Sequence, residues 1–246
     1  MSTELVIYES KEDIAIITLN RPEKLNALNV DLGEQLRAAF QRFQAGSDRV
    51  AILASSSSRA FTVGADLTHP PEIWRFTPSV GVDVDKPIIA AVDGYCVGGG
   101  VVLIQFCDLC VAADTTVFSY PEAKVGVTGG LISSLAARIP HKIAMEFVLY
   151  ASDITAQRAY EVGMVNKVVP ADQLMDAAMD YARTLKEHAP MVLSTLKRFV
   201  GEVINKGPSE QAGIARRSTE AILDSEDKLE GIASFKEKRP PRFTGN

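Results

Sequence analysis

Three consecutive glycines, Gly98, Gly99 and Gly100, lie between two apolar runs of the sequence. The first run, residues 88–92, has the length of a buried strand, and the second, residues 101–104, continues directly from the glycines. A flexible linker would be polar on both sides, so the glycines are predicted to lie buried at a strand-to-helix corner. Corners of this kind are typical of folds in which strands alternate with helices.

The first half of the chain follows such an alternation. Leu32, Leu36, Phe40 and Phe43 recur at helical spacing, with Asn29 as the expected N-cap and Gly46 at the expected end. Short apolar or alternating stretches predict strands at residues 4–9, 13–20, 50–54, 88–92, 108–113 and 117–119, with a turn at residues 10–13. Strands separated by helices predict crossover connections and a largely parallel sheet.

The pattern becomes mainly helical after residue 130. Helical periodicity covers residues 131–139, 143–150, 155–162, 172–188, 191–204, 209–223 and 228–236. We therefore predict an α/β core over residues 1–190, followed by a helical C-terminal region over residues 191–246. Residues 68–86 are rich in proline and lack periodicity, so they are predicted to form a long loop, a kind of segment that often carries function.

Charge and cysteine content exclude several classes of protein. A formal net charge of −5 argues against a protein that coats nucleic acid or an anionic membrane. The N-terminus lacks a secretion signal, and no apolar run approaches the roughly 20 residues of a membrane helix. Cys96, Cys107 and Cys110 are too few for a disulfide framework and are interpreted as packing residues, without a metal site. These features predict a cytoplasmic protein.

Three stretches could carry chemistry. The glycine triplet at a helix start would leave backbone N–H groups free for a ligand, although close helix packing would also require small residues. Gly64, Ala65 and Asp66 follow an apolar stretch and could turn the chain into a cleft, although an ordinary turn explains them too. Glu122 follows Tyr120 and Pro121 at the end of an apolar strand, where burial would raise the pKa of its carboxyl, although glutamates are more often solvated.

Several stretches in fixed order resemble one known family. They are residues 17–28 (ITLNRPEKLNAL), 60–67 (AFTVGADL), 86–100 (KPIIAAVDGYCVGGG), 120–127 (YPEAKVGV), 156–165 (AQRAYEVGMV) and 225–239. Together they resemble the crotonase superfamily, in particular the enoyl-CoA hydratase/isomerase family. The resemblance covers nearly the whole chain. It implies an α/β crotonase (ClpP-like) spiral of ββα units, with a helical C-terminal region that mediates assembly into homotrimers or hexamers.

The resemblance also implies site residues. The backbone N–H groups of Ala65 and Gly99 would hold the thioester carbonyl of an acyl-CoA, and Glu122 would transfer a proton. Contacts to coenzyme A would come from Lys24, Leu25, Ala27, Gly64, Asp66, Leu67, Val97 and Gly98. Phe235 and Lys238 match positions that reach coenzyme A on a neighbouring subunit. The coenzyme A thioester would be the substrate, with no tightly bound cofactor.

One departure from the family bears on the reaction. Hydratases of the family use two glutamates, but the first of these positions holds Val102, which cannot activate water or move a proton. A single carboxylate is typical of the family's enoyl-CoA isomerases and of its lyases that act on hydroxyacyl-CoA. We therefore expect isomerisation of an enoyl-CoA double bond. Hydration, lyase chemistry and a catalytically silent acyl-CoA binding protein stay as alternatives.

Two further stretches differ from the family pattern. Residues 127–131 replace a stretch that usually contains a proline and a glycine-rich run, which would alter the pocket wall beside Glu122. The loop at 68–86 is short for the family and carries His69, Trp74 and Arg75. One of these three could supply a second polar group or set acyl specificity, although loop residues of these types are more often structural.

Overall fold

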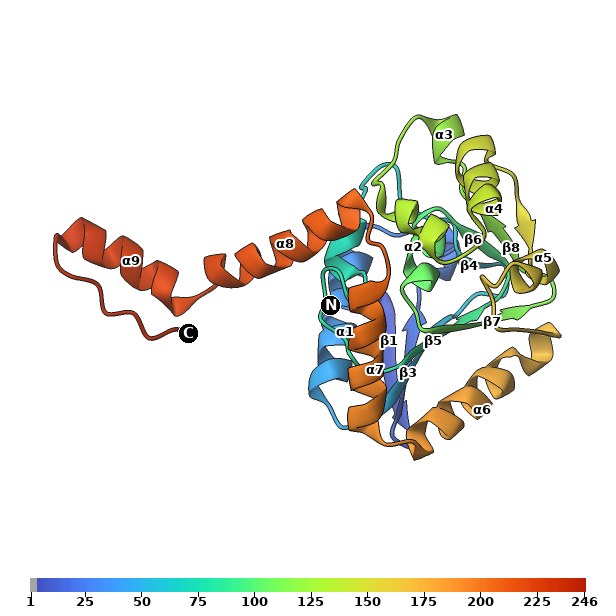
Figure 1. Cartoon of the computed structure of the whole chain (residues 1–246), viewed down its shortest axis with the longest axis horizontal. Coiled ribbons are helices and arrows are strands. Elements are labelled where there is room, and N and C mark those ends of the chain that lie inside the picture. The colour runs from blue at the N-terminus through green and yellow to red at the C-terminus, as the bar shows by residue number, and fades with distance from the viewer. Residues whose placement is uncertain (1–3) are drawn as a thin grey trace.

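The larger of two sheets has six strands, in the order β1-β2-β3-β5-β7-β10 (Figure 1). The computed structural model describes residues 4–246. The strands are β1 (Val6–Lys11), β2 (Ile14–Leu19), β3 (Val50–Ser55), β5 (Ile88–Val92), β7 (Leu109–Ala113) and β10 (Lys167–Val169). β1 and β2 form an antiparallel hairpin, and all other neighbours in this sheet pair in parallel. The predicted mixed α/β architecture with a largely parallel sheet is confirmed.

The hairpin turn lies one residue later than predicted. β1 continues to Lys11, and the reversal is made by Glu12 and Asp13, whose φ angles are 56° and 59°. Asp is among the residues that tolerate the left-handed conformation, which favours a turn at this pair. The predicted turn at residues 10–13 therefore contains both residues that reverse the chain, and β1 runs two residues further than predicted.

The smaller sheet contains four short strands that the sequence indicated only in part. In order they are β4 (Ala60–Thr62), β6 (Tyr95–Val97), β8 (Val117–Ser119) and β9 (Ile154–Thr155). Only β8 was predicted, because strands of two or three residues have too few positions to show a period. β4, β6 and β8 pair in parallel, so the segments that follow them emerge at one edge.

Helices cover both faces of the six-stranded sheet. Ile52 packs with α6 (Leu174–Glu187), whereas its neighbour Leu53 packs on the side of α1 (Val30–Ala45). This alternation is expected because successive side chains of a strand point to opposite faces. α1 begins as predicted, since the Asn29 side chain accepts a hydrogen bond of 3.0 Å from the Leu32 N–H.

The middle of the chain is less regular than its periodicity suggested. It contains α2 (Gly99–Gln105), α3 (Glu122–Val125), α4 (His141–Met145) and α5 (Ala156–Glu161). The helix predicted at 131–139 is the 3₁₀ helix η3 (Leu131–Ala137), and Pro140 follows it closely. The helix predicted at 143–150 starts as α4 and continues as the π-helical segment η4 (Glu146–Tyr150). Shorter 3₁₀ turns are η1 (Pro22–Lys24), η2 (Ile73–Phe76) and η5 (Ala171–Gln173).

The last three helices extend the chain beyond its core. α7 (Pro190–Val203) lies on the body, where the Lys197 ammonium contacts Asp108 Oδ2 at 2.8 Å. α8 (Pro208–Leu223) then leads away, and α9 (Glu226–Glu237) stands at its far end (Figure 1). We call residues 4–203 the body and residues 208–246 the arm. The division at residue 190 into two domains stays a prediction. Among residues 4–246, no helix is both long and apolar enough to span a bilayer.

Candidate functional site

The glycine triplet lies at the corner between β6 and α2, as predicted. Gly98 has φ +53° and ψ −109°, and it is followed by the first helical residue, Gly99. The Gly98 N–H donates to the Ser119 carbonyl at 2.9 Å, which ties this corner to the end of β8. The N–H of Gly99 has no carbonyl one turn earlier in the helix to accept it, so it is available at the helix start.

Each glycine of the triplet is required by a different close contact. A Cβ at Gly98 would lie 2.6 Å from Glu122 Oε1, and one at Gly100 would lie 2.5 Å from Thr62 Cγ2. A Cβ at Gly99 would lie 2.9 Å from Ile73 Cδ1. The close-packing interpretation therefore applies at Gly100, and Gly98 leaves room for the Glu122 carboxylate, whereas binding of a ligand by the free N–H groups stays a prediction.

The second backbone segment runs beside the start of α2. Gly64 has φ +88°, and a Cβ at this residue would lie 3.5 Å from the Gly99 nitrogen. Leu28 and Ala65 form a parallel bridge, in which the Leu28 N–H donates to Gly64 O at 2.8 Å and Leu28 O accepts from Asp66 N–H at 2.7 Å. In a parallel bridge of this kind, the residue whose two neighbours make the hydrogen bonds directs its own N–H away from the partner segment. The Ala65 N–H is thus directed away from Leu28.

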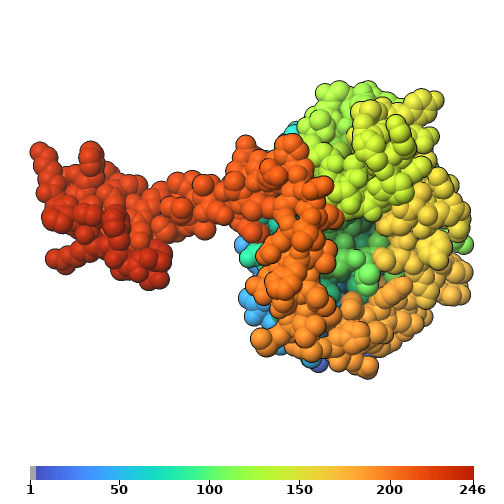
Figure 2. All heavy atoms as spheres, viewed as in Figure 1, coloured from blue at the N-terminus to red at the C-terminus, as the bar shows by residue number. Residues whose placement is uncertain are grey.

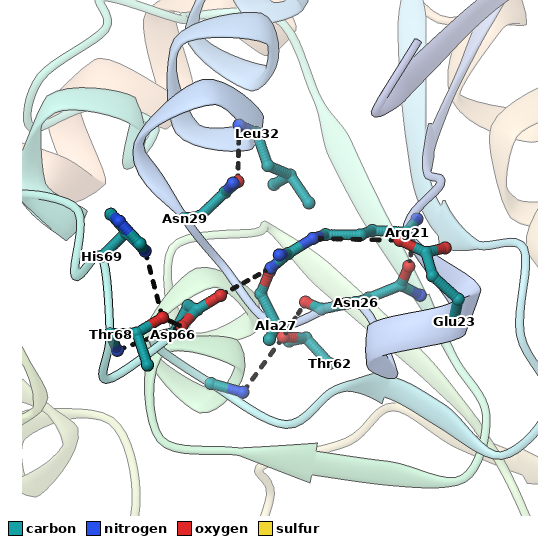
Figure 3. Close-up of polar contacts among 11 residues, drawn as sticks. Arg21, Glu23, Asn26, Ala27, Asn29, Leu32, Thr62, Asp66, Thr68 and His69 are labelled. Carbon is teal, nitrogen blue, oxygen red and sulfur yellow. Dashed lines mark hydrogen bonds and ion pairs between the residues drawn. The ribbon is translucent and has the colours of Figure 1, made fainter. Parts of the chain in front are cut away.

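A polar network fixes the position of this second segment (Figure 3). The Arg21 guanidinium donates to the carbonyl of Ala27 at 3.0 Å and to Asp66 Oδ2 at 2.8 Å. The buried Asn26 side chain accepts from the Arg21 N–H at 2.7 Å, and the Thr62 hydroxyl donates to Asn26 O at 2.6 Å. The network joins the segments that carry the expected coenzyme A contacts.

Sequence reasoning overlooked Arg21, Asn26 and Thr62. All three lie within or beside the motifs that carried the resemblance, at residues 17–28 and 60–67. The available signal was a basic residue in one motif and an acidic residue, Asp66, in the other. Hydrogen bonds from Thr68 and Arg21 lower the pKa of the Asp66 carboxyl, so this side chain remains ionised and compensated by the protein itself.

Glu122 lies beside Gly98 because β6 and β8 are paired. Val97 is opposite Ser119 in the parallel register, so the chain leaving β8 passes the glycine corner within three residues. Glu122 Oε2 is buried and has no hydrogen-bond partner among residues 4–246. Burial raises the pKa of the Glu122 carboxyl to about 7, opposed by a hydrogen bond from its own backbone N–H. The carboxyl is therefore poised to take up or release a proton near neutral pH.

The position on α2 where a second glutamate was considered is apolar and buried. Val102 lies on α2 and is 5% exposed, and its neighbours Val101 and Leu103 are fully buried. Tyr120 is also buried and its hydroxyl pairs with that of Thr128 at 3.0 Å. Burial raises the pKa of Tyr120 to about 12, so it stays protonated at neutral pH.

The three loop residues that could have supplied a second polar group face away from the glycine triplet or into solvent. His69 is exposed and lies 3.1 Å from the Thr68 hydroxyl. Trp74 packs toward α8, where a Cβ at Gly213 would lie 3.4 Å from Trp74 Cβ. The Arg75 guanidinium contacts Glu220 of the same helix at 3.0 Å. The loop residue that faces the glycine corner is Ile73, which the sequence did not single out.

The expected coenzyme A contacts separate into two groups. In the first group, Leu25 and Ala27 are partly buried and Lys24 is exposed on η1. The Val63 N–H donates to Leu25 O at 3.2 Å. This hydrogen bond places the segment next to Gly64, Asp66 and Leu67. Val97 and Gly98 lie at the corner itself. Phe235, which is 86% exposed, and Lys238 lie on or just after α9, at the far end of the arm, and are not brought to this site in the same chain (Figure 1).

A separate hollow lies at the other end of α2 (Figure 2). This cavity of about 340 Å³ is lined by Ile104 and Gln105 of α2, by Arg138, and by Lys197 and Val200 of α7, among others. Neither Glu122, Ala65 nor Gly99 borders it. It is therefore distinct from the corner at Gly98.

The comparison with family models gives one match over almost the full length. The model described as enoyl-CoA hydratase/isomerase matches residues 9–73 and 79–246. The unmatched residues 74–78 fall in the loop that the sequence showed to be unusual.

Similar proteins carry related descriptions. A probable enoyl-CoA hydratase of Mycobacterium bovis is 35% identical over 256 residues, covering 99% of each chain. A 2,3-dehydroadipyl-CoA hydratase of Escherichia coli is 30% identical, covering 98% of each. Among solved structures, an enoyl-CoA hydratase from Mycobacterium tuberculosis is 32% identical, with a TM-score of 0.77 over 99% of this chain and 100% of that one. These likenesses confirm the predicted fold.

Proposed function

Because this chain belongs to the enoyl-CoA hydratase/isomerase family, as its full-length match establishes, we propose that it moves the double bond of an enoyl-CoA. In this proposal the N–H groups of Ala65 and Gly99 hold the thioester oxygen. Glu122 removes a proton from one carbon and returns it to another. The observation that carries the proposal is a single buried carboxyl beside the glycine corner, with Val102 at the alternative position.

Charge on the thioester oxygen is the first requirement of this reaction. Removing a proton next to the thioester gives an enolate, and donors already aimed at its oxygen lower the barrier. Loss of one such donor in comparable sites costs about 3 kcal/mol. The approach of Gly64 to the Gly99 nitrogen supports this role, because it brings the two backbone segments close together.

Proton transfer is the second requirement. A carboxyl with a pKa of about 7 is close to half ionised at neutral pH, so the same group can accept a proton and give it back. A 3-enoyl-CoA would lose a proton from C2 to Glu122, and the resulting dienolate would regain that proton at C4. No atom is gained or lost, so this chemistry requires no water and no second carboxylate.

Hydration is the second candidate, because relatives of this chain are described as hydratases. In that reaction water adds across the double bond, and Glu122 alone would have to take a proton from the water and supply one to the α-carbon. Positioned acid–base groups each contribute roughly 100- to 10,000-fold. Because Val102 provides neither function, we favour isomerisation. Lyase chemistry on a hydroxyacyl-CoA and silent acyl-CoA binding are further outcomes of the same test.

The test compares Glu122→Gln with Glu146→Gln, a substitution of an exposed carboxyl on η4. Both proteins and the wild type are incubated with 2-enoyl-CoA and 3-enoyl-CoA; absorbance of the conjugated 2-enoyl thioester reports isomerisation, and mass reports addition of water. We expect wild-type isomerisation without mass gain, a loss of 100-fold or more in Glu122→Gln, and no loss in Glu146→Gln. A product heavier by one water would replace isomerisation with hydration. Unchanged turnover in Glu122→Gln would remove the glutamate from the mechanism.

The proposal extends to assembly and location. We propose a homotrimer or hexamer, supported by apolar side chains that one chain leaves exposed, including Met191 and Val203 on α7 at 82% and 81%. The coenzyme A thioester is the proposed substrate, and no tightly bound cofactor enters the reaction. Cytoplasmic location stays a prediction.

A further inference from the structure

Ile73 is the side chain that faces the first residue of α2 from the loop. A Cβ at Gly99 would lie 2.9 Å from Ile73 Cδ1 and 3.0 Å from Leu28 Cδ1. Leu28 is fully buried, whereas Ile73 is only partly buried. The end of the Ile73 side chain therefore lies within one side-chain length of the N–H proposed to hold the thioester oxygen.

The residues around Ile73 hold it in place. Phe76, one 3₁₀ turn later, packs on α1, because a Cβ at Gly33 would lie 2.6 Å from Phe76 Cε1. On the opposite side, Trp74 packs toward Gly213 of α8, and Arg75 pairs with Glu220. A 3₁₀ helix has three residues per turn, so its successive side chains point in three directions. Trp74 and Arg75 fix two of these directions through α8. Ile73 and Phe76 share the third, in which Phe76 packs on α1 and Ile73 faces Gly99.

We propose that Ile73 determines specificity by limiting bulk on the acyl carbon next to the thioester. The inference rests on the proposed function only in placing that thioester on the Gly99 N–H. An unbranched acyl group would pass beside Cδ1, whereas a methyl group on C2 would have to occupy part of the same space. The substrate class assigned by this geometry is therefore enoyl-CoA that is unbranched at C2.

The direct test removes only the atom nearest the glycine. Ile73→Val deletes Cδ1, and Ile73→Ala enlarges the space further. The dissociation constants of butanoyl-CoA and 2-methylbutanoyl-CoA, two saturated esters that cannot turn over, are measured by calorimetry. One methyl group in a fitted pocket changes discrimination by about 10-fold or more. We expect wild-type protein to prefer the unbranched ester by about that factor, and the preference to shrink severalfold in Ile73→Val and nearly vanish in Ile73→Ala.

Trp74→Phe is the matched control, because it alters the same turn on the side that faces α8. It is expected to keep the wild-type preference. An unchanged preference in both Ile73 variants, an equal change in Trp74→Phe, or a wild-type protein that binds neither ester would each overturn the proposal. Isomerisation of a 3-enoyl-CoA is assayed in the same preparations. If the Ile73 variants shift the binding preference but the wild-type protein does not isomerise the 3-enoyl-CoA, the proposed reaction is rejected and the proposed role of Ile73 stands.

Discussion

The body and the arm satisfy the hydrophobic requirement of folding in different ways. In the body, the large side chains of α1, such as Phe40 and Phe43, are fully buried against the sheet. In the arm, Phe235 is 86% exposed and Leu229 is 66% exposed, although both lie on a well-formed helix. Burial of such a side chain is worth about 1.5–3 kcal/mol, so these two side chains of the arm do not contribute the stabilisation that Phe40 and Phe43 provide in the body.

The most demanding test of this difference substitutes one glycine of the body and one glycine of the arm by alanine. Gly98→Ala places a Cβ 2.6 Å from Glu122 Oε1 at a positive φ, which displaces the proposed proton carrier. We expect kcat to fall by about 100-fold, comparable to removing one aligned catalytic group. In the arm, Gly231→Ala meets only ordinary contacts, 3.6 Å from Phe243, and replaces glycine inside a helix.

Gly231→Ala should keep kcat and gain up to about 1 kcal/mol of helix stability. Enoyl-CoA turnover measures the first effect and thermal unfolding measures the second. Equal loss of turnover in both variants would mean that the glycine corner is no more demanding than the arm.

Assembly provides the next largest effect. Phe235→Ser removes an exposed apolar side chain from α9, and Leu149→Ser does the same at a 65% exposed position of the body. If the arm is buried against another chain, Phe235→Ser should weaken association about 10-fold or more, whereas Leu149→Ser should not. Sedimentation over a range of concentrations reports both. A monomeric wild-type protein at all concentrations would show that the exposed arm has no second copy as its partner.

Within the body, the ion pair of Arg21 and Asp66 tests how finely the segment that carries Ala65 is positioned. Both side chains are about 85% buried, and Arg21 also holds the Ala27 carbonyl. Arg21→Gln should lower kcat/KM about 10-fold, because hydrogen bonds to charged groups contribute about 1.5–3 kcal/mol. In the Arg21→Gln protein, the further loss of kcat/KM caused by Asp66→Asn should be smaller than the loss that Asp66→Asn causes in the wild type, since the two side chains form one ion pair. Strictly additive losses would show that the two residues act independently.

The smallest effect concerns pH. The folded state keeps the Glu122 proton up to about pH 7, whereas an unfolded glutamate loses it near pH 4.5, so the wild-type protein loses stability as pH rises through that window. Glu122→Gln has no such proton and should gain in thermal stability relative to wild type between pH 4.5 and 7, with no further change above. A constant difference between the two proteins from pH 4 to 8 would contradict the raised pKa.

Sequence and structure agree best where chemistry depends on the backbone. The glycine corner, the turn at Gly64 and the burial of Glu122 were predicted because glycine and a carboxyl after an apolar strand carry local signals. The loop at 68–86 carried no such signal. Its ordering at η2 depends on Gly33 of α1 and Gly213 of α8, far apart in the sequence, so the roles of Ile73 and Trp74 required the tertiary contacts.

The middle helices show a second limit. Periodicity predicted helices at 131–139 and 143–150, but the structure contains a 3₁₀ helix and a π-helical segment there. These forms differ from an α-helix by the residue that accepts each hydrogen bond, and apolar spacing over eight or nine residues does not distinguish them. Contacts of this region with α8 also lie beyond the reach of local pattern, as at Gly130, where a Cβ would lie 2.4 Å from Ser209 Oγ.

α8 touches both the turn that carries Ile73 and the start of η3, through Gly213 and Ser209. The stem of the arm therefore packs behind the turn that carries Ile73. If binding of an acyl-CoA beside Ile73 and association through the arm each shift α8, the two equilibria are thermodynamically linked. Any factor by which the ester then changes the association of neighbouring chains is the factor by which association changes the affinity for the ester.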